Sequence, residues 1–118
     1  MFEKGSIIQR RVKGLEGFFG AVHTGIYVGG GYVIHFAGES SGSKGSGEIE
    51  KITLEEFADG EEVTLREAPH SIEHGLSVVS RAYDYLTNRK LNGKYSLGSC
   101  NCQDFVYECF EGRRHCNI

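Results

Sequence analysis

The sequence predicts an α+β protein in which a small antiparallel sheet packs against helices, and three observations lead to this class. The chain has 118 residues, the length of one ordinary domain. Its first half holds two runs of β-branched and aromatic residues around three glycines, which is typical of a β-hairpin. Its second half holds apolar residues every three or four positions, which is typical of a helix. We expect residues 1–118 to form a single domain.

The composition is that of a folded, soluble protein. Hydrophobic residues make up 39% of the chain and charged residues 25%, so the composition is close to the globular average and unlike that of a disordered chain. The net charge is −3 and the Lys and Arg residues are scattered, which argues against a nucleic-acid partner. The sequence contains neither a secretion signal nor a run of ~20 apolar residues, so we expect a cytoplasmic protein.

Strands are expected mainly in the N-terminal half. Residues 4–12 form a short strand candidate, and a Gly-rich connection over 13–20 follows it. Residues 21–28 and 32–37 are the two strands of the hairpin. The Gly/Ser segment 38–47 has the composition of a mobile surface flap, which would leave the sheet directly after the hairpin.

A short helix is expected over residues 53–60. Thr53 is a suitable N-cap, Glu56 lies three residues later and completes a capping box, and Gly60 ends the helix. Residues 61–68 alternate enough in polarity to form a further strand.

Two longer helices complete the predicted fold. After Pro69, one apolar stripe is predicted to consist of Ile72, Leu76, Val79, Tyr83 and Leu86. Gly75 weakens the first turn of that helix without removing the pattern. Residues 91–99 are expected to form a turn and a short strand, and the last helix runs from near Asn101 to Gly112.

The start of the last helix is the first candidate for chemistry. Its apolar face is predicted to consist of Phe105, Val106, Cys109 and Phe110, and Cys102 precedes them on the same side. Asn101 is a favoured N-cap and Asp104 occupies the third helical position, so Cys102 is the first helical residue. A thiol at a helix N-terminus has a lowered pKa, and its thiolate is a nucleophile. Amide groups of the same turn are suited to stabilise an oxyanion.

The hairpin is the second candidate, because it carries His23 and His35. A two-residue turn would place the two histidines on opposite faces of the sheet. A three-residue loop over 29–31 pairs Val28 with Tyr32 and places both rings on one face, about 7–8 Å apart. Glycine supplies the positive φ that such loops need, so the triple glycine favours the second register without excluding the first.

Together these residues are the parts of thiol-based acyl transfer. His23 would take the proton of Cys102, His35 would orient His23, and the thiolate would attack an ester or amide carbonyl.

Two segments resemble a known family. "HTGIYVGGGYVIHFAG" and "NCQDFVYECFEG" are similar to the paired signatures of the lecithin:retinol acyltransferase-like proteins, permuted relatives of papain-like and NlpC-type thiol hydrolases. The resemblance implies a small α+β domain, an acyl-cysteine intermediate on Cys102, His23 as general base and His35 as third member. It implies no cofactor. Animal members move acyl chains from phospholipids to other acceptors or to water, so the implied partner is a lipid or other acyl ester, with possible peripheral contact to a membrane.

The sequence also departs from the family pattern. Thr24 stands where the family often has tryptophan, and Gln103 and Asp104 replace the Glu-His of the "NCEH" motif. The hydrophobic C-terminal tail of many animal members is absent from the sequence. The catalytic chemistry therefore carries over better than the substrate does.

Three other interpretations remain open. One is a non-catalytic interaction module that retains the fold, and another is a cysteine amidase or peptidase with the same triad. A zinc site is the third, since Cys100, Cys102, Cys109, His115 and Cys116 are soft ligands, but their spacing is not that of zinc sites and we expect no metal. The four cysteines are expected to be free thiols, and Cys109 to belong to the core.

Overall fold

The computed structural model describes residues 2–13, 20–38, 47–96 and 98–117. The strands are β1 (Ile7–Arg11), β2 (Val22–Gly29), β3 (Tyr32–Ala37), β4 (Glu48–Thr53) and β5 (Thr64–Glu67). The helices are α2 (Leu54–Ala58), α3 (Ile72–Thr87) and α4 (Cys102–Glu111).

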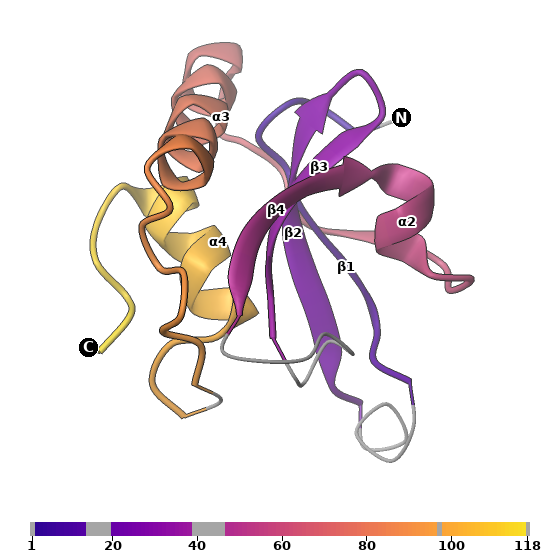
Figure 1. The fold of residues 1–118 in the computed structure, drawn as a ribbon. Coiled ribbons are helices and arrows are strands. Elements are labelled where there is room, and N and C mark those ends of the chain that lie inside the picture. The colour runs from indigo at the N-terminus through magenta and orange to yellow at the C-terminus, as the bar shows by residue number, and fades with distance from the viewer. Residues whose placement is uncertain (1, 14–19, 39–46, 97, 118) are drawn as a thin grey trace.

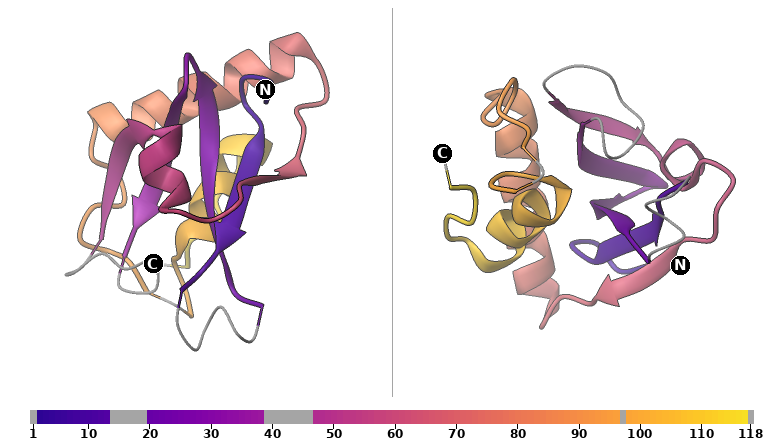
Figure 2. Two further views of the ribbon diagram at one scale, coloured as in Figure 1. Left: turned by 90° about the vertical axis from the view of Figure 1, so that its right-hand side faces the viewer. Right: turned by 90° about the horizontal axis from the view of Figure 1, so that it is seen from below.

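The five strands form one antiparallel sheet in the order β4-β3-β2-β1-β5. Helices α3 and α4 cover one face of this sheet, and α2 lies on the other side (Figure 1). The two further views in Figure 2 show the same arrangement, with α3 and α4 beside one another and both in contact with the sheet. The predicted α+β class, with a small antiparallel sheet against helices, is confirmed. Within the described residues, no helix is long and apolar enough to cross a membrane.

Alternation along the strands produces two separate apolar clusters. The cluster under α3 and α4 includes Ile7, Ile26, Ile34, Phe36, Val78, Phe105, Val106 and Cys109. The cluster on the α2 side consists of Ile8, Tyr27, Val33 and Phe57. Each strand of the hairpin therefore contributes to both faces, and the sheet is buried on both sides at its centre.

The register of the hairpin is mostly as predicted. Gly29 lies opposite Tyr32, so the predicted pairing of Val28 with Tyr32 is wrong. The register shifts by one residue between Gly29 and Tyr27, and from Tyr27 opposite Val33 onward it is the register of a three-residue loop. All three glycines of the turn have positive φ. The bulge thus places the two histidines on one face, as predicted.

Helix α2 confirms the predicted capping box. The Thr53 side chain accepts from the Glu56 amide, and the Glu56 carboxylate accepts from the Thr53 amide. The helix ends one turn later, at Asp59 in the left-handed conformation. The strands predicted over 4–12 and 61–68 are present but shorter.

Strand β4 was not predicted, because Glu48, Glu50 and Lys51 give it few apolar positions. It forms by pairing along the whole length of β3. Most of the connection 13–20 and of the flap 38–47 lies outside the described residues, so neither prediction is tested.

The buried side of α3 differs from the predicted stripe in its first turns, whereas Val79, Tyr83 and Leu86 pack against the core as predicted. Ile72 and Leu76 are 82% and 54% exposed. The buried positions are Gly75, Val78 and Ala82. The helix faces the sheet in this way because Gly75 has no side chain and can lie close to the Lys4 backbone. A Cβ at Gly75 would lie only 2.3 Å from the Lys4 carbonyl oxygen. Gly75 is therefore a packing position.

Gly25 also allows a close approach, on the α2 side of the sheet, and its replacement is expected to destabilise the protein. A Cβ there would lie 2.7 Å from Val33 Cγ1 and 2.9 Å from Phe57 Cε1. We expect Gly25→Ala to lower the free energy of unfolding by about 1–3 kcal/mol, measured by urea denaturation. Gly98→Ala, where the new Cβ meets nothing within 4 Å, is the control and should change it by less than ~0.5 kcal/mol. Equal stability of the two variants would contradict this packing.

Candidate active site

The structure brings His23 of β2 and His35 of β3 into direct contact. His23 Nε2 and His35 Nδ1 are 2.8 Å apart, within hydrogen-bond distance, and the ring centroids are 5.0 Å apart. The residues are only 1% and 8% exposed. The shared face predicted from the hairpin register is therefore occupied by a buried histidine pair.

Phe57 of α2 packs on this pair. Its ring stacks on His23 with centroids 5.4 Å apart, and meets His35 edge to face at 6.1 Å. Burial lowers the pKa of His23 well below its ordinary value of 6.5, and the neighbouring His35 and Arg10 lower it further. His23 is therefore a neutral imidazole at neutral pH.

Glu50 of β4 extends the pair to a chain of three side chains. It lies opposite His35 in the sheet, and its Oε1 is 3.2 Å from His35 Nε2. The hydrogen bond from His35 lowers the pKa of Glu50, so its side chain is a carboxylate at neutral pH. Sequence reasoning missed Glu50 because strand β4 was not recognised. The β-branched residues Ile49, Ile52 and Thr53 were the available signal.

Arg10 is a second residue that the sequence analysis did not single out. It lies opposite His23 on β1, is largely buried, and donates from Nε to the Phe57 carbonyl oxygen at 2.7 Å. Burial lowers the pKa of Arg10, and attraction by Asp59, Glu61 and Cys102 opposes this. The guanidinium is thus a buried positive charge that interacts electrostatically with both His23 and Cys102.

Cys102 is the first residue of α4, as predicted. Asn101 is the N-cap, with its side-chain oxygen accepting from the amides of Gln103 and Asp104. The Asp104 carboxylate in turn accepts from the Asn101 amide. Two amides of the first turn are therefore used by the cap, and the Cys102 amide is the one that the cap leaves for an oxyanion.

The histidine pair and the body of α4 lie on opposite faces of the sheet. The rings pack on Phe57 of α2, whereas Phe105 and the following apolar residues of α4 belong to the other cluster. The first turn of α4 lies toward the end of the sheet where β2 begins and β3 ends (Figure 1). The first turn of α4 and the histidine-bearing ends of β2 and β3 therefore lie toward the same end of the sheet.

The second ring nitrogen of His23, Nδ1, is not engaged by His35. It is buried and has no hydrogen-bond partner among the described residues, so the structure shows no hydrogen bond from Cys102 to it. A buried polar atom without a partner is unusual in folded proteins. The structure thus joins His23 Nε2 to His35 and leaves Nδ1 without a partner among the described residues.

The prediction of four free thiols is wrong for two of the cysteines. Cys100 and Cys116 form a disulfide, whereas Cys102 and Cys109 are free and buried. The two bonded sulfurs are 16 residues apart in sequence and meet because the segment after α4 folds back toward the helix start. Disulfide sulfurs are not thiolates, so two of the proposed zinc ligands are unavailable in this state. Cys109 is a core residue, as predicted.

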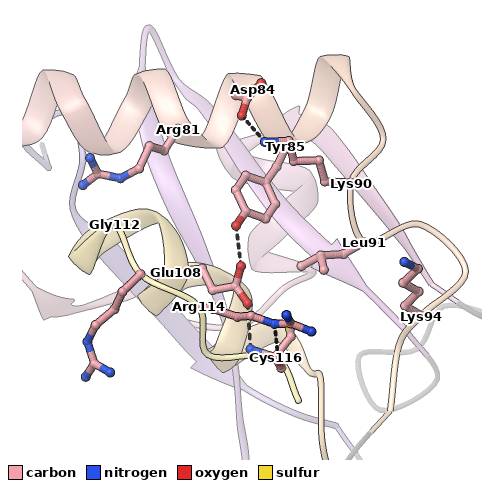
Figure 3. A pocket seen from close by; sticks show the side chains of 11 residues that line it. Arg81, Asp84, Tyr85, Lys90, Leu91, Lys94, Glu108, Gly112, Arg114 and Cys116 are labelled. Carbon is pink, nitrogen blue, oxygen red and sulfur yellow. Dashed lines mark hydrogen bonds and ion pairs between the residues drawn. The ribbon is translucent and has the colours of Figure 1, made fainter. Parts of the chain in front are cut away.

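A separate cavity of about 530 Å³ lies between α3 and the C-terminal segment (Figure 3). Glu108 of α4 is buried at its wall, accepts from the Tyr85 hydroxyl, and accepts from the amides of His115 and Cys116. Burial and the Glu108 carboxylate raise the pKa of Tyr85, so Tyr85 stays a donor. This cluster holds the C-terminal segment in place and contains none of the predicted site residues.

Comparison with known proteins identifies the class of protein that this fold and site define. The family model of lecithin retinol acyltransferase matches residues 2–115. The chain belongs to this family, whose fold is NlpC- and papain-like. Membership implies a thiol acyltransferase or hydrolase that acts on an acyl-ester lipid. No curated protein sequence matches the chain.

The lowered pKa of His23 predicts a specific pH dependence of stability. Below about pH 6.5 the unfolded chain binds a proton at this residue that the folded protein does not. The free energy of unfolding should therefore fall, by up to about 1.4 kcal/mol per pH unit, as the pH decreases from that value, with no contribution above it. Urea denaturation between pH 5 and 7 measures this slope.

The His23→Gln variant lacks this titration and should show a shallower slope than the wild type. His70→Gln, which removes an exposed histidine, is the control. Parallel curves for the wild type and His23→Gln would show that His23 titrates alike in both states.

Proposed function

We propose that the protein is a cysteine-dependent acyltransferase or hydrolase that acts on an acyl ester of a phospholipid through an acyl-Cys102 intermediate. The observation that carries the proposal is the neutral, buried His23, whose Nδ1 has no partner among the described residues while Nε2 is held by His35. A general base needs this combination of a held ring and an available lone pair.

Two features of the structure provide a positive electrostatic potential at Cys102. The residue lies at the first position of α4, at the positive end of the helix dipole. The buried guanidinium of Arg10 interacts electrostatically with the same side chain. His23 needs only to accept the proton in the step in which the sulfur attacks.

The reaction then follows in two balanced steps. The Cys102 proton passes to His23 Nδ1, the sulfur forms a bond to the carbonyl carbon, and the ester C–O bond breaks as the leaving alkoxide takes the proton from His23. An acceptor alcohol, amine or water next gives its proton to His23 and attacks the thioester carbonyl, the C–S bond breaks, and the Cys102 sulfur takes the proton back from His23. The Cys102 amide is suited to stabilise the oxyanion in both steps.

A non-catalytic interaction module is the second candidate. The observation that favours it is the absence of a hydrogen bond between Cys102 and His23 in the described structure. Catalytic hydrogen bonds are often long before substrate binds, so this absence alone does not decide between the two. The reactivity of the thiol decides, because an interaction module has no need of an activated cysteine.

Formation of the acyl-enzyme tests the proposal directly. We expect incubation with phosphatidylcholine vesicles, or with an activated ester, to add one acyl group to the intact protein, detected by mass spectrometry. Cys102→Ala should abolish the adduct because it removes the nucleophile. Cys109→Ala removes the other free thiol by the same change and should retain the adduct. An adduct that persists in Cys102→Ala would reject the assignment of the nucleophile.

The reactivity of Cys102 separates an enzyme from an interaction module. In a Cys109→Ala background with the disulfide intact, we expect iodoacetamide to label Cys102 at pH 7, with His23 accepting the proton of the thiol. Replacing His23 with Gln should slow this labelling, because the base no longer takes the proton. Equal labelling rates in the two proteins would favour the interaction module.

A further inference from the structure

Glu50 lies at the outer end of the hydrogen-bonded chain and is the one member of it that can only accept. Its side chain is 45% exposed while that of His35 is 10% exposed, so it connects the buried pair to the surface. The hydrogen bond from His35 lowers its pKa and keeps it ionised at neutral pH. A carboxylate has no proton to donate, so the hydrogen in this contact belongs to His35 Nε2.

With one N–H on each ring, this constraint determines where both hydrogens lie. A neutral imidazole carries one N–H, so a proton on His35 Nε2 leaves His35 Nδ1 as an acceptor. The partner of that acceptor, 2.8 Å away, is His23 Nε2, which must then be the donor. Neutral His23 therefore has its proton on Nε2 and its lone pair on Nδ1, the buried atom without a partner among the described residues.

We propose that Glu50 is a positioning residue that selects these tautomers and thereby keeps His23 Nδ1 free to accept the Cys102 proton. The inference deepens the proposed function and rests on it for its catalytic meaning. When His23 accepts that proton, its Nε2–H is already donated to His35, so no rearrangement of the chain is required. Glu50 acts through His35 and touches neither the thiol nor the substrate.

Among the described residues, Glu50 is the acid that hydrogen-bonds to the histidine pair. Glu56, whose charge acts on Glu50, is engaged elsewhere. Its carboxylate is held by the Thr53 amide and hydroxyl in the capping box of α2. Removing Glu50 therefore leaves His35 Nε2 without its acceptor.

The tautomers are measured by nitrogen-15 NMR of the histidine rings, with His23 and His35 assigned from their single variants. At pH 7 we expect wild-type His23 and His35 each to carry a proton on Nε2 and none on Nδ1. In Glu50→Gln the amide can donate as well as accept, so the reverse tautomers become possible and the ring signals should shift toward them. This readout does not depend on activity.

Glu48→Gln is the matched control, because it removes the same charge from the same strand without touching the pair. Glu48 is exposed and lies near Arg89, with 3.9 Å between the charged atoms. The histidine ring signals of Glu48→Gln should equal those of the wild type. A wild-type His23 with its proton on Nδ1, or a His35 protonated on both nitrogens, would overturn the proposal, as would unchanged tautomers in Glu50→Gln.

The acylation rate of Cys102 supplies the second readout. We expect Glu50→Gln and Glu50→Ala to slow single-turnover acylation by roughly tenfold or more, as loss of a group that orients a functional histidine typically does, while Glu48→Gln leaves it unchanged. Acylation at the wild-type rate in the Glu50 variants would overturn the proposal. If the wild type forms no adduct, the proposed function fails, and the ring tautomers still test the role of Glu50.

Discussion

The register between β2 and β3 is the constraint on which the rest of the site depends. A slip by one residue would turn His35 to the opposite face and separate it from His23. The bulge next to the glycine turn prevents this slip. It adds one residue to β2, so that Gly29 lies opposite Tyr32 while Tyr27 lies opposite Val33. The 2.8 Å contact between the two rings follows from that register. The position of Glu50 follows from the register between β3 and β4, which places Glu50 directly opposite His35.

Burial gives the histidine pair its chemical character. The pair is covered by Phe57, which reaches it because Gly25 has no side chain to keep the phenyl ring away. The short helix α2 holds Phe57 in this position through its capping box at Thr53. Loss of solvent keeps His23 uncharged, and the positive charge of Arg10 acts in the same direction. A neutral imidazole with a fixed tautomer is the form that can accept a proton, so apolar packing and hydrogen bonding both favour the proposed role of His23 as a base.

Cys102 is positioned by a different set of interactions, on the far side of the sheet from α2. The Asn101 cap fixes the first turn of α4, and the apolar face of the helix fixes its axis against the sheet. The disulfide of Cys100 joins the residue just before that cap to the C-terminal segment, which buried Glu108 also holds. The proposed nucleophile and the proposed base are therefore carried by separate structural units, helix α4 and the hairpin of β2 and β3. Arg10, opposite His23 and within the electrostatic range of Cys102, links the two.

The sequence by itself determined the features that depend on neighbours along the chain. The glycine turn and its flanking strands, the capping box at Thr53, the helix over Ile72–Thr87 and the start of α4 at Cys102 all follow from local patterns, and the family signature lies within two of these segments. Only the tertiary structure decided the partnership of His35 with Glu50, the burial of Arg10, the disulfide between Cys100 and Cys116, and the exposure of Ile72. These depend on cross-strand register and on close approach of distant segments, which local periodicity does not encode. Local sequence patterns identify the candidate reacting groups, and tertiary packing determines which side chains those groups contact.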